Sequence, residues 1–171
     1  VDIDDLMHRF LEAAFESGLA VDGVVAQSQA QARNLWAIRE GMNLGQAQRG
    51  RHLRTDVSVP LSRLADFVAE AEAAVTARMP GCICVSYGHV GDGNLHFNLF
   101  PAEGRGRADY AAQAADLALL VYDKVAERGG AFSAEHGVGR ARTGDVAHYG
   151  DPARIAAMAA IKRALDPPGI L

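Results

Sequence analysis

The chain of 171 residues is long enough for one domain with a hydrophobic core of its own. Its net charge of −4, without any cluster of Lys and Arg residues, argues against nucleic acid as a partner and favours a small molecule. No run of about 18 apolar residues predicts a membrane span, and we expect a soluble, cytoplasmic protein.

The first fifty residues predict two helices with a short strand between them. Apolar residues recur at helical spacing from Asp2 to Ser17, which predicts a helix with one buried face. The valines of Asp22–Gln27 predict a strand. Ser28 and Gln31 have the spacing of a capping box and indicate where a second helix begins. Three apolar residues of that helix are expected to face inward: Leu35, Ile38 and Met42.

From Leu53 onward the elements follow the order strand, helix, strand, strand, helix, strand. We expect the first strand at 55–59, the long helices at 61–79 and 108–128, and the last strand at 131–133. This order is typical of the ferredoxin-like unit, so the sequence predicts an α+β fold with a four-stranded antiparallel sheet and both helices on one face. Glu103–Arg107 is expected to be a loop without a phosphate site, and Asp151 is expected to cap a final helix.

The two middle strands predict a β-hairpin between Ser86 and Phe100. If its turn centres on Asp92-Gly93, His89 lies directly opposite His96 and both side chains share one face. Tyr87 and Asn98 fall on the same side as the two histidines. Three apolar residues take the other face, where we expect the core: Leu95, Phe97 and Leu99. Cys82 and Cys84 are too close for an unstrained disulfide, and we expect them to be buried and reduced.

Three residues form a candidate metal site: His89, His96 and Glu135. Two imidazoles and one carboxylate favour zinc and leave a fourth position for substrate or water. His136 is then free to act as a general base, and Gly137 and Gly139 are expected to let the backbone approach another group closely. In an ideal ferredoxin-like sheet the last strand runs away from the hairpin turn, so Glu135 reaches the histidines only if that strand is very short.

Other interpretations of these residues stay open at this point. His, His and Glu beside a general base also suit a zinc-dependent hydrolase that activates water. Without a bound metal, the chain is a non-catalytic ferredoxin-like binding module. Arg39 and Asn43 share one helix face, and a lone Arg on a helix is by default a solvated charge.

Two motifs, Y-G-H-V-G-D-G-N-L-H-F-N and G-G-A-F-S-A-E-H-G-V-G-R, closely resemble the C-terminal domain of FAD-linked 2-hydroxy acid dehydrogenases and oxidases. This family includes D-lactate dehydrogenases, glycolate oxidase subunits and D-2-hydroxyglutarate dehydrogenases. Three further stretches carry the resemblance: L-W-A-I-R-E, T-D-V-S-V-P and I-K-R-A-L-D-P-P-G-I-L. By this resemblance the chain is a substrate or cap domain whose N-terminal FAD-binding domain is absent.

The resemblance implies a role for each site residue. The metal is bound by His89, His96 and Glu135, and His136 takes the proton of the substrate hydroxyl. Arg39 binds a carboxylate, and the substrate-binding residues are completed by Asn43, Arg54 and Asn98. Asn43 and Arg54 stand where members of the D-2-hydroxyglutarate type have a threonine and a lysine, so the far end of the substrate pocket is chemically altered.

The implied reaction is the oxidation of a D-2-hydroxy acid to the 2-oxo acid, with hydride transferred to FAD. We expect the isolated chain to be inactive, since FAD is held mainly by a domain outside it. The partners are then a small 2-hydroxy acid, the FAD domain and an electron acceptor of unknown identity; a homodimer stays open. We divide the chain into residues 1–52 as the tail of a preceding unit, 53–135 as the ferredoxin-like unit, and 136–171 as a C-terminal loop and helix.

Overall fold

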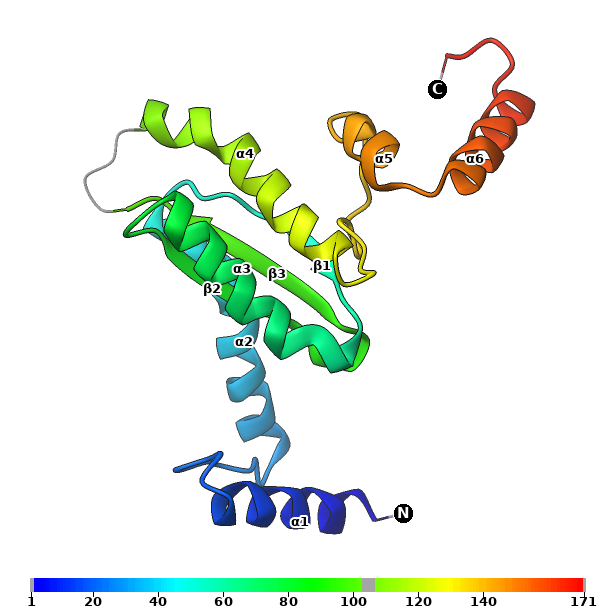
Figure 1. Cartoon of the computed structure of the whole chain (residues 1–171). Coiled ribbons are helices and arrows are strands. Elements are labelled where there is room, and N and C mark those ends of the chain that lie inside the picture. Colours follow the sequence, from blue (N-terminus) through cyan, green and yellow to red (C-terminus); the bar gives the residue numbers. More distant parts are fainter. Residues whose placement is uncertain (1, 103–106, 171) are drawn as a thin grey trace. The chain divides into compact units, whose positions relative to one another are not determined.

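The computed structural model describes residues 2–102 and 107–170 (Figure 1). The expected loop at Glu103–Arg107 therefore lies almost entirely outside the described residues. The chain forms two compact units, Val1–Arg49 and Gly50–Leu171.

The first unit contains the two predicted helices, α1 (Ile3–Glu16) and α2 (Gln29–Arg49). The carboxylate of Asp2 caps α1 because it accepts hydrogen bonds from the amides of Asp4 and Asp5. At the start of α2, the Ser28 hydroxyl accepts a hydrogen bond from the Gln31 amide at 3.2 Å, as the capping-box spacing predicts.

Two expectations for this unit are wrong. Residues 22–27 form no strand, since none of the described residues pairs with them and a strand needs a partner for its backbone groups. The apolar residues of the helices are also more exposed than predicted, because α1 has no buried residue and Phe10 and Ile38 are 66% and 73% exposed. Leu35 is exposed and Met42 is half-buried. A two-helix unit has too little surface to cover these side chains.

The second unit contains the remaining elements. The strands are β1 (Asp56–Ser58), β2 (Ile83–His89) and β3 (Asn94–Phe100), and the long helices are α3 (Leu64–Arg78) and α4 (Arg107–Ala126). The short turns η1 (Leu61–Arg63) and η2 (Val90–Asp92) precede α3 and β3, and α5 (Thr143–Tyr149) and α6 (Pro152–Leu165) follow α4. The Asp151 carboxylate caps α6 as predicted, whereas α5 was not expected from the sequence.

The strands form an antiparallel sheet in the order β1-β3-β2, and α3 and α4 cover one face of it (Figure 1). This arrangement confirms the α+β class. The expected four-stranded sheet is wrong for the described residues, which contain three strands. Residues 131–134 lie beside β1 and make only bridges to Ser58 and Asp56. Their place still corresponds to the fourth strand of a ferredoxin-like unit, at the edge next to β1.

The alternation of β3 places its apolar residues in the core as predicted. Leu95, Phe97 and Leu99 are at most 5% exposed and pack with Val57 of β1 and with α3 and α4. The Phe97 ring meets the Phe67 ring of α3 edge to face, with centroids 5.9 Å apart. The helices therefore stabilise this face of the sheet, and the opposite face carries His96 and Asn98 together with apolar residues such as Val85 and Phe100.

Both cysteines are free, as expected, and half-buried. Burial, followed by the neighbouring Cys82, raises the pKa of the Cys84 thiol to about 12. This thiol is therefore protonated and unreactive at neutral pH. None of the described helices is both long enough and apolar enough to cross a membrane.

Candidate metal and catalytic site

The hairpin brings the two histidines to one face, but in a register different from the expected one. Tyr87 pairs with His96, and His89 pairs with Asn94. The turn is longer than predicted because Val90–Asp92 forms a short 3-10 turn that ends at Gly93, in the left-handed region with φ of 73°. The shift is two residues, so every side chain keeps its predicted face. His89 and His96 are diagonal neighbours with ring centroids 6.1 Å apart.

Gly93 is required at this turn for two reasons. Its positive φ is unfavourable for any residue with a Cβ atom, and a Cβ there would collide with the Val59 carbonyl oxygen. Gly137 and Gly139 also have positive φ, of 72° and 53°, but no atom lies within 4 Å of a Cβ built on either. The expectation of a close backbone approach at these two glycines is therefore wrong, and their left-handed conformation accounts for them instead.

Glu135 reaches the histidines because the segment before it is short. The segment starts beside the hairpin turn, where the Ala131 amide donates to the Ser58 carbonyl, and the Ala134 amide donates to the Asp56 carbonyl at 3.0 Å. Asp56 is the residue of β1 that pairs with His96. The chain leaves the edge of the sheet at this level, so Glu135 follows directly beside His96.

The Glu135 carboxylate lies between the three imidazoles. Its Oε1 is 3.4 Å from Nε2 of His96 and 3.5 Å from Nε2 of His136, and its Oε2 is 4.0 Å from Nε2 of His89. Ligand atoms around a four-coordinate zinc ion are about 3.3 Å apart, given bonds of about 2.0–2.1 Å. The pair His96 and Glu135 is close to this spacing, whereas His89 lies farther from Glu135, and the three donor types suit a divalent metal ion.

Asp56 belongs to the same cluster, and sequence reasoning missed it. One ligand atom from each of four residues lies within 4.8 Å of the others in the group Asp56, His96, Glu135 and His136, and the predicted ligand His89 is not a member of this group. The Asp56 side chain is only 7% exposed, and its Oδ2 accepts hydrogen bonds from the amides of Glu135 at 2.9 Å and His136 at 2.8 Å. An acidic residue between the buried residues Thr55 and Val57 was the available signal, since Asp is rarely buried without a partner.

The surroundings of Asp56 and His96 shift the pKa of each. Burial alone would raise the pKa of Asp56, but the amide of His136, then that of Glu135, and the nearby His136 and His96 rings together lower it. The pKa of His96 is lowered chiefly by burial, against the opposing effect of Asp56 and Glu135. The site therefore favours a charged Asp56 and a neutral His96, the form in which an imidazole binds metal.

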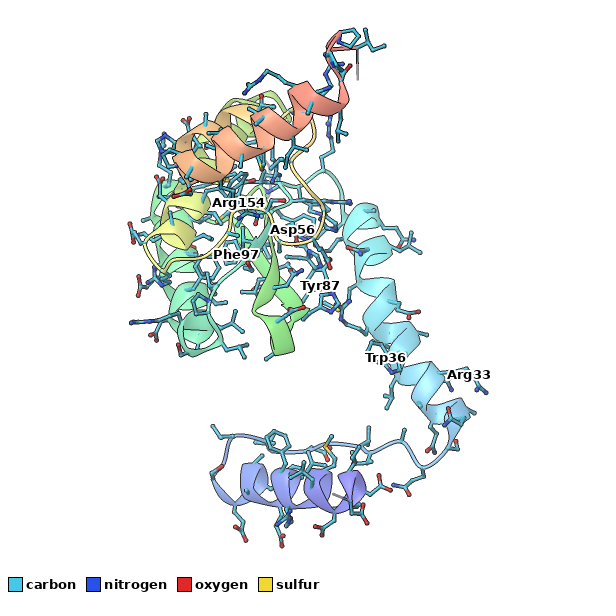
Figure 2. The ribbon with its side chains drawn as sticks, turned by 90° about the vertical axis from the view of Figure 1, so that its right-hand side faces the viewer. Arg33, Trp36, Asp56, Tyr87, Phe97 and Arg154 are labelled. Carbon is cyan, nitrogen blue, oxygen red and sulfur yellow. The ribbon has the colours of Figure 1, made fainter. Side chains whose placement is uncertain are left out.

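The residues predicted to bind the substrate lie on different elements of the fold. Asn98 is buried on β3, on the face of His96, and Arg54 is exposed just before β1, where its Nε donates to His52 Nε2 at 3.1 Å. Arg39 and Asn43 lie on α2 in the first unit. Figure 2 shows Phe97 on the helix side of the sheet and Tyr87 on the other side.

A cleft of about 500 Å³ lies between the end of α4, α5 and α6. Its lining includes Phe132, Tyr149 and Met158, and it contains none of the four clustered residues. This cleft therefore does not coincide with the polar site, which lies on the open face of the sheet.

The family model for the C-terminal domain of FAD-linked oxidases matches residues 2–171. The chain belongs to the family of FAD-linked oxidase C-terminal domains. A D-2-hydroxyglutarate dehydrogenase from Xanthomonas citri pv. viticola is 36% identical over 156 residues, which are 91% of this chain and 33% of that protein. One from Stutzerimonas stutzeri is 33% identical over 160 residues, or 94% of this chain and 34% of that protein.

A relative from Rattus norvegicus, named D-2-hydroxyglutarate dehydrogenase, mitochondrial, is 36% identical over 161 residues, or 94% of this chain and 29% of that protein. This FAD-linked oxidase C-terminal domain thus spans about a third of the length of the curated relatives that it matches. The polar site described above lies within the part that these relatives share with it.

Proposed function

We propose that this chain is the substrate- and metal-binding domain of an FAD-linked dehydrogenase that oxidises a D-2-hydroxy acid to the corresponding 2-oxo acid. The observation that supports this most directly is the convergence of His89, His96 and His136 on the Glu135 carboxylate, in a chain of the FAD-linked oxidase family. Family membership favours this reaction over hydrolysis by the same residues.

The proposal assigns a divalent metal ion to His89, His96 and Glu135, and the two imidazoles and one carboxylate favour zinc. Such an ion, when bound, polarises the hydroxyl oxygen of the substrate and makes its proton more acidic. FAD, held mainly by the rest of the protein, supplies the hydride acceptor. No residue of this chain is assigned to FAD.

His136 is the proposed general base. Its Nε2 faces the cluster and its ring is stacked on that of His96, with centroids 5.4 Å apart and planes inclined by 16°. The side chain is 63% exposed, so an incoming hydroxyl can reach it. Transfer of the hydroxyl proton to His136 and departure of hydride from C2 leave a carbon–oxygen double bond, and the charges balance.

The substrate-binding residues are proposed from the sequence pattern. Arg39 binds the carboxylate next to C2, because a guanidinium offers two parallel N–H donors to the two oxygens. Asn98 lies on the face of the metal-binding histidines, and Asn43 and Arg54 are assigned to the far end of the substrate. The relatives are named for D-2-hydroxyglutarate, and the changes at positions 43 and 54 predict a preference for a hydroxy acid with a different far end.

Reduction of the flavin tests this function. The full-length protein that carries this chain is mixed anaerobically with a panel of D-2-hydroxy acids and their L enantiomers, and the absorbance of oxidised FAD is followed. We expect bleaching by D enantiomers only, and its loss in the His136→Ala variant. Flavin that stays oxidised with every D-2-hydroxy acid contradicts the proposal. The chain of residues 1–171 alone is expected to bind no FAD and to oxidise none of these acids.

A further inference from the structure

Asp56 is a buried carboxylate for which the proposed reaction has no step. It lies in β1, directly beside His96 of β3, and its side chain is 7% exposed. A charged group in such a place lowers stability unless several donors surround it. Those donors indicate what the carboxylate does.

The two oxygens of Asp56 face different groups. Oδ2 accepts hydrogen bonds from the amides of Glu135 and His136 and lies 3.4 Å from Nδ1 of His136. Oδ1 is buried, has no hydrogen-bond partner among the described residues, and lies 3.9 Å from Nδ1 of His96. A buried carboxylate oxygen is stabilised by a donor, and an Nδ1–H of His96 is the donor that faces it.

Both imidazoles therefore have the same orientation. Each turns Nδ1 toward Asp56 and Nε2 toward Oε1 of Glu135, at 3.4 Å for His96 and 3.5 Å for His136. In a neutral imidazole only one nitrogen carries the proton, and the hydrogen bond made by one nitrogen decides the state of the other. When Glu135 is engaged as a metal ligand, Asp56 is the carboxylate left to both rings, where it holds the proton on Nδ1 and leaves Nε2 with its lone pair.

We propose that Asp56 is a positioning residue that keeps the proton on Nδ1 of both His96 and His136. Nε2 of His96 is then free to bind the metal ion, and Nε2 of His136 is free to accept the proton of the substrate. One carboxylate thus prepares a metal ligand and a general base together, while its bonds to two amides fix the backbone of Glu135 and His136. This inference rests on the proposed function for the roles of the two Nε2 atoms.

The contrasting possibility is that Asp56 is itself a metal ligand, which its distance from the cluster allows. Two observations argue against it. Oδ2 already accepts two amide hydrogen bonds, and both oxygens face the Nδ1 side of the imidazoles, whereas the carboxylate of Glu135 is on the Nε2 side.

The Asp56→Asn variant of the full-length protein tests the inference. Its amide oxygen can replace Oδ2, where it accepts hydrogen bonds from the two backbone amides and faces His136. Its NH₂ group then replaces Oδ1, donates to Nδ1 of His96 and moves the proton of that ring to Nε2. We expect metal affinity to fall about 10- to 100-fold, as for other groups that orient a metal ligand. We expect kcat to fall by about 10²-fold or more with little change in KM. Asp116→Asn, at an exposed carboxylate of α4, is the matched control and should change neither quantity.

A second measurement reads the proton positions without metal or turnover. In metal-free Glu135→Ala protein labelled with ¹⁵N-histidine, where the competing carboxylate at Nε2 is removed, His96 and His136 are assigned by their loss in the His96→Gln and His136→Gln variants. We expect both neutral rings to carry the proton on Nδ1 in this protein, and His96 to carry it on Nε2 once Asp56→Asn is added. Protons on Nε2 in the Glu135→Ala protein overturn the inference, as does an Asp56→Asn variant that changes only the melting temperature.

The two proposals can fail separately. Metal X-ray absorption that places an Asp56 oxygen in the coordination sphere overturns the positioning role and leaves the reaction intact. If the Glu135→Ala protein shows Nδ1–H imidazoles and the metal affinity of the parent depends on Asp56, but no D-2-hydroxy acid reduces the parent's flavin, the inference stands and the proposed function fails.

Discussion

The two faces of the three-stranded sheet are built from alternate residues of the same strands and are stabilised differently. On the helix face, Val57, Leu95 and Phe97 are buried by α3 and α4 through contacts that have no directional requirement. On the other face, Asp56 and His96 occupy neighbouring positions of β1 and β3, and their arrangement depends on specific donors and acceptors.

Within one short hairpin, residues that stabilise the fold therefore alternate with residues of the polar site. Substitutions on the helix face should change the free energy of unfolding, whereas those on the polar face should change metal binding and catalysis. Variants of the full-length protein that carries this chain distinguish the two kinds of residue.

The largest effect is expected for the double variant His89→Ala/His96→Ala. Metal content measured after zinc loading should fall from about one ion per chain to almost none, because the remaining carboxylate of Glu135 cannot hold the ion alone. The His8→Ala/His148→Ala variant removes two histidines outside the site and should keep the full content. Equal metal in the two double variants would show that the site lies elsewhere.

His136→Ala should lower kcat by about 10²- to 10⁴-fold, the usual range for a lost general base, while metal content and melting temperature stay near those of the parent. Arg39→Ala provides the contrast, because loss of a group that binds substrate and transition state alike should mainly raise KM. If the His136 variant loses its metal instead, His136 is a ligand and Glu135 becomes the candidate base.

Phe97→Ala should reduce the free energy of unfolding by about 3–5 kcal/mol, because its ring is fully buried against Phe67 and leaves a cavity. Chemical denaturation measures this change, and zinc content per folded molecule should be unaffected. Val90→Ala, at an exposed turn position, is the control and should change stability by no more than about 0.5 kcal/mol. Loss of zinc from folded Phe97→Ala would mean that the two faces are not independent.

The smallest effect concerns pH and the metal-free protein. The pKa of His96 is lowered from its usual value of 6.5, mainly by burial, with His136 and His89 acting in the same direction and Asp56 and Glu135 against it. The unfolded chain therefore gains this proton first, and stability should decrease as pH falls below about 6.5. A second decrease should follow below about 3.8, because the pKa of Asp56 is also lowered.

Denaturation curves between pH 3 and pH 8 resolve these two decreases. His96→Gln should remove the first one and Asp56→Asn the second. A curve for the His96→Gln variant that keeps the parent's slope just below pH 6.5 would assign that decrease to another group.

The periodicity of the sequence predicts reliably which face of the sheet each side chain takes. Strict alternation in β3 places Leu95, Phe97 and Leu99 in the core and His96 on the other face, and a two-residue error in register does not alter that assignment. The register itself depends on the turn, where the 3-10 conformation of Val90–Asp92 adds residues that a two-residue turn does not have. Local sequence cannot distinguish these turns easily, because Gly93 with a positive φ suits both.

Other features depended on contacts that the sequence does not display. The valines of 22–27 have strand propensity, but no described strand pairs with them, and propensity alone forms no sheet. Asp56 looked like an ordinary polar residue of an alternating strand. Its importance comes from the amides of Glu135 and His136, about 80 residues away in the chain, and only the fold brings them together.

The length of the short segment from Gly130 to Ala134 determines where Glu135 lies in the site. A Cβ at Gly130 would collide with the Ser58 carbonyl, which fixes where the segment starts, and the bond from Ala134 to Asp56 fixes where it ends. Each added residue in an extended segment advances it by about 3.3 Å and reverses the direction of the following side chains. A single-residue insertion between these points would therefore carry the Glu135 carboxylate past His96 and separate it from the imidazoles.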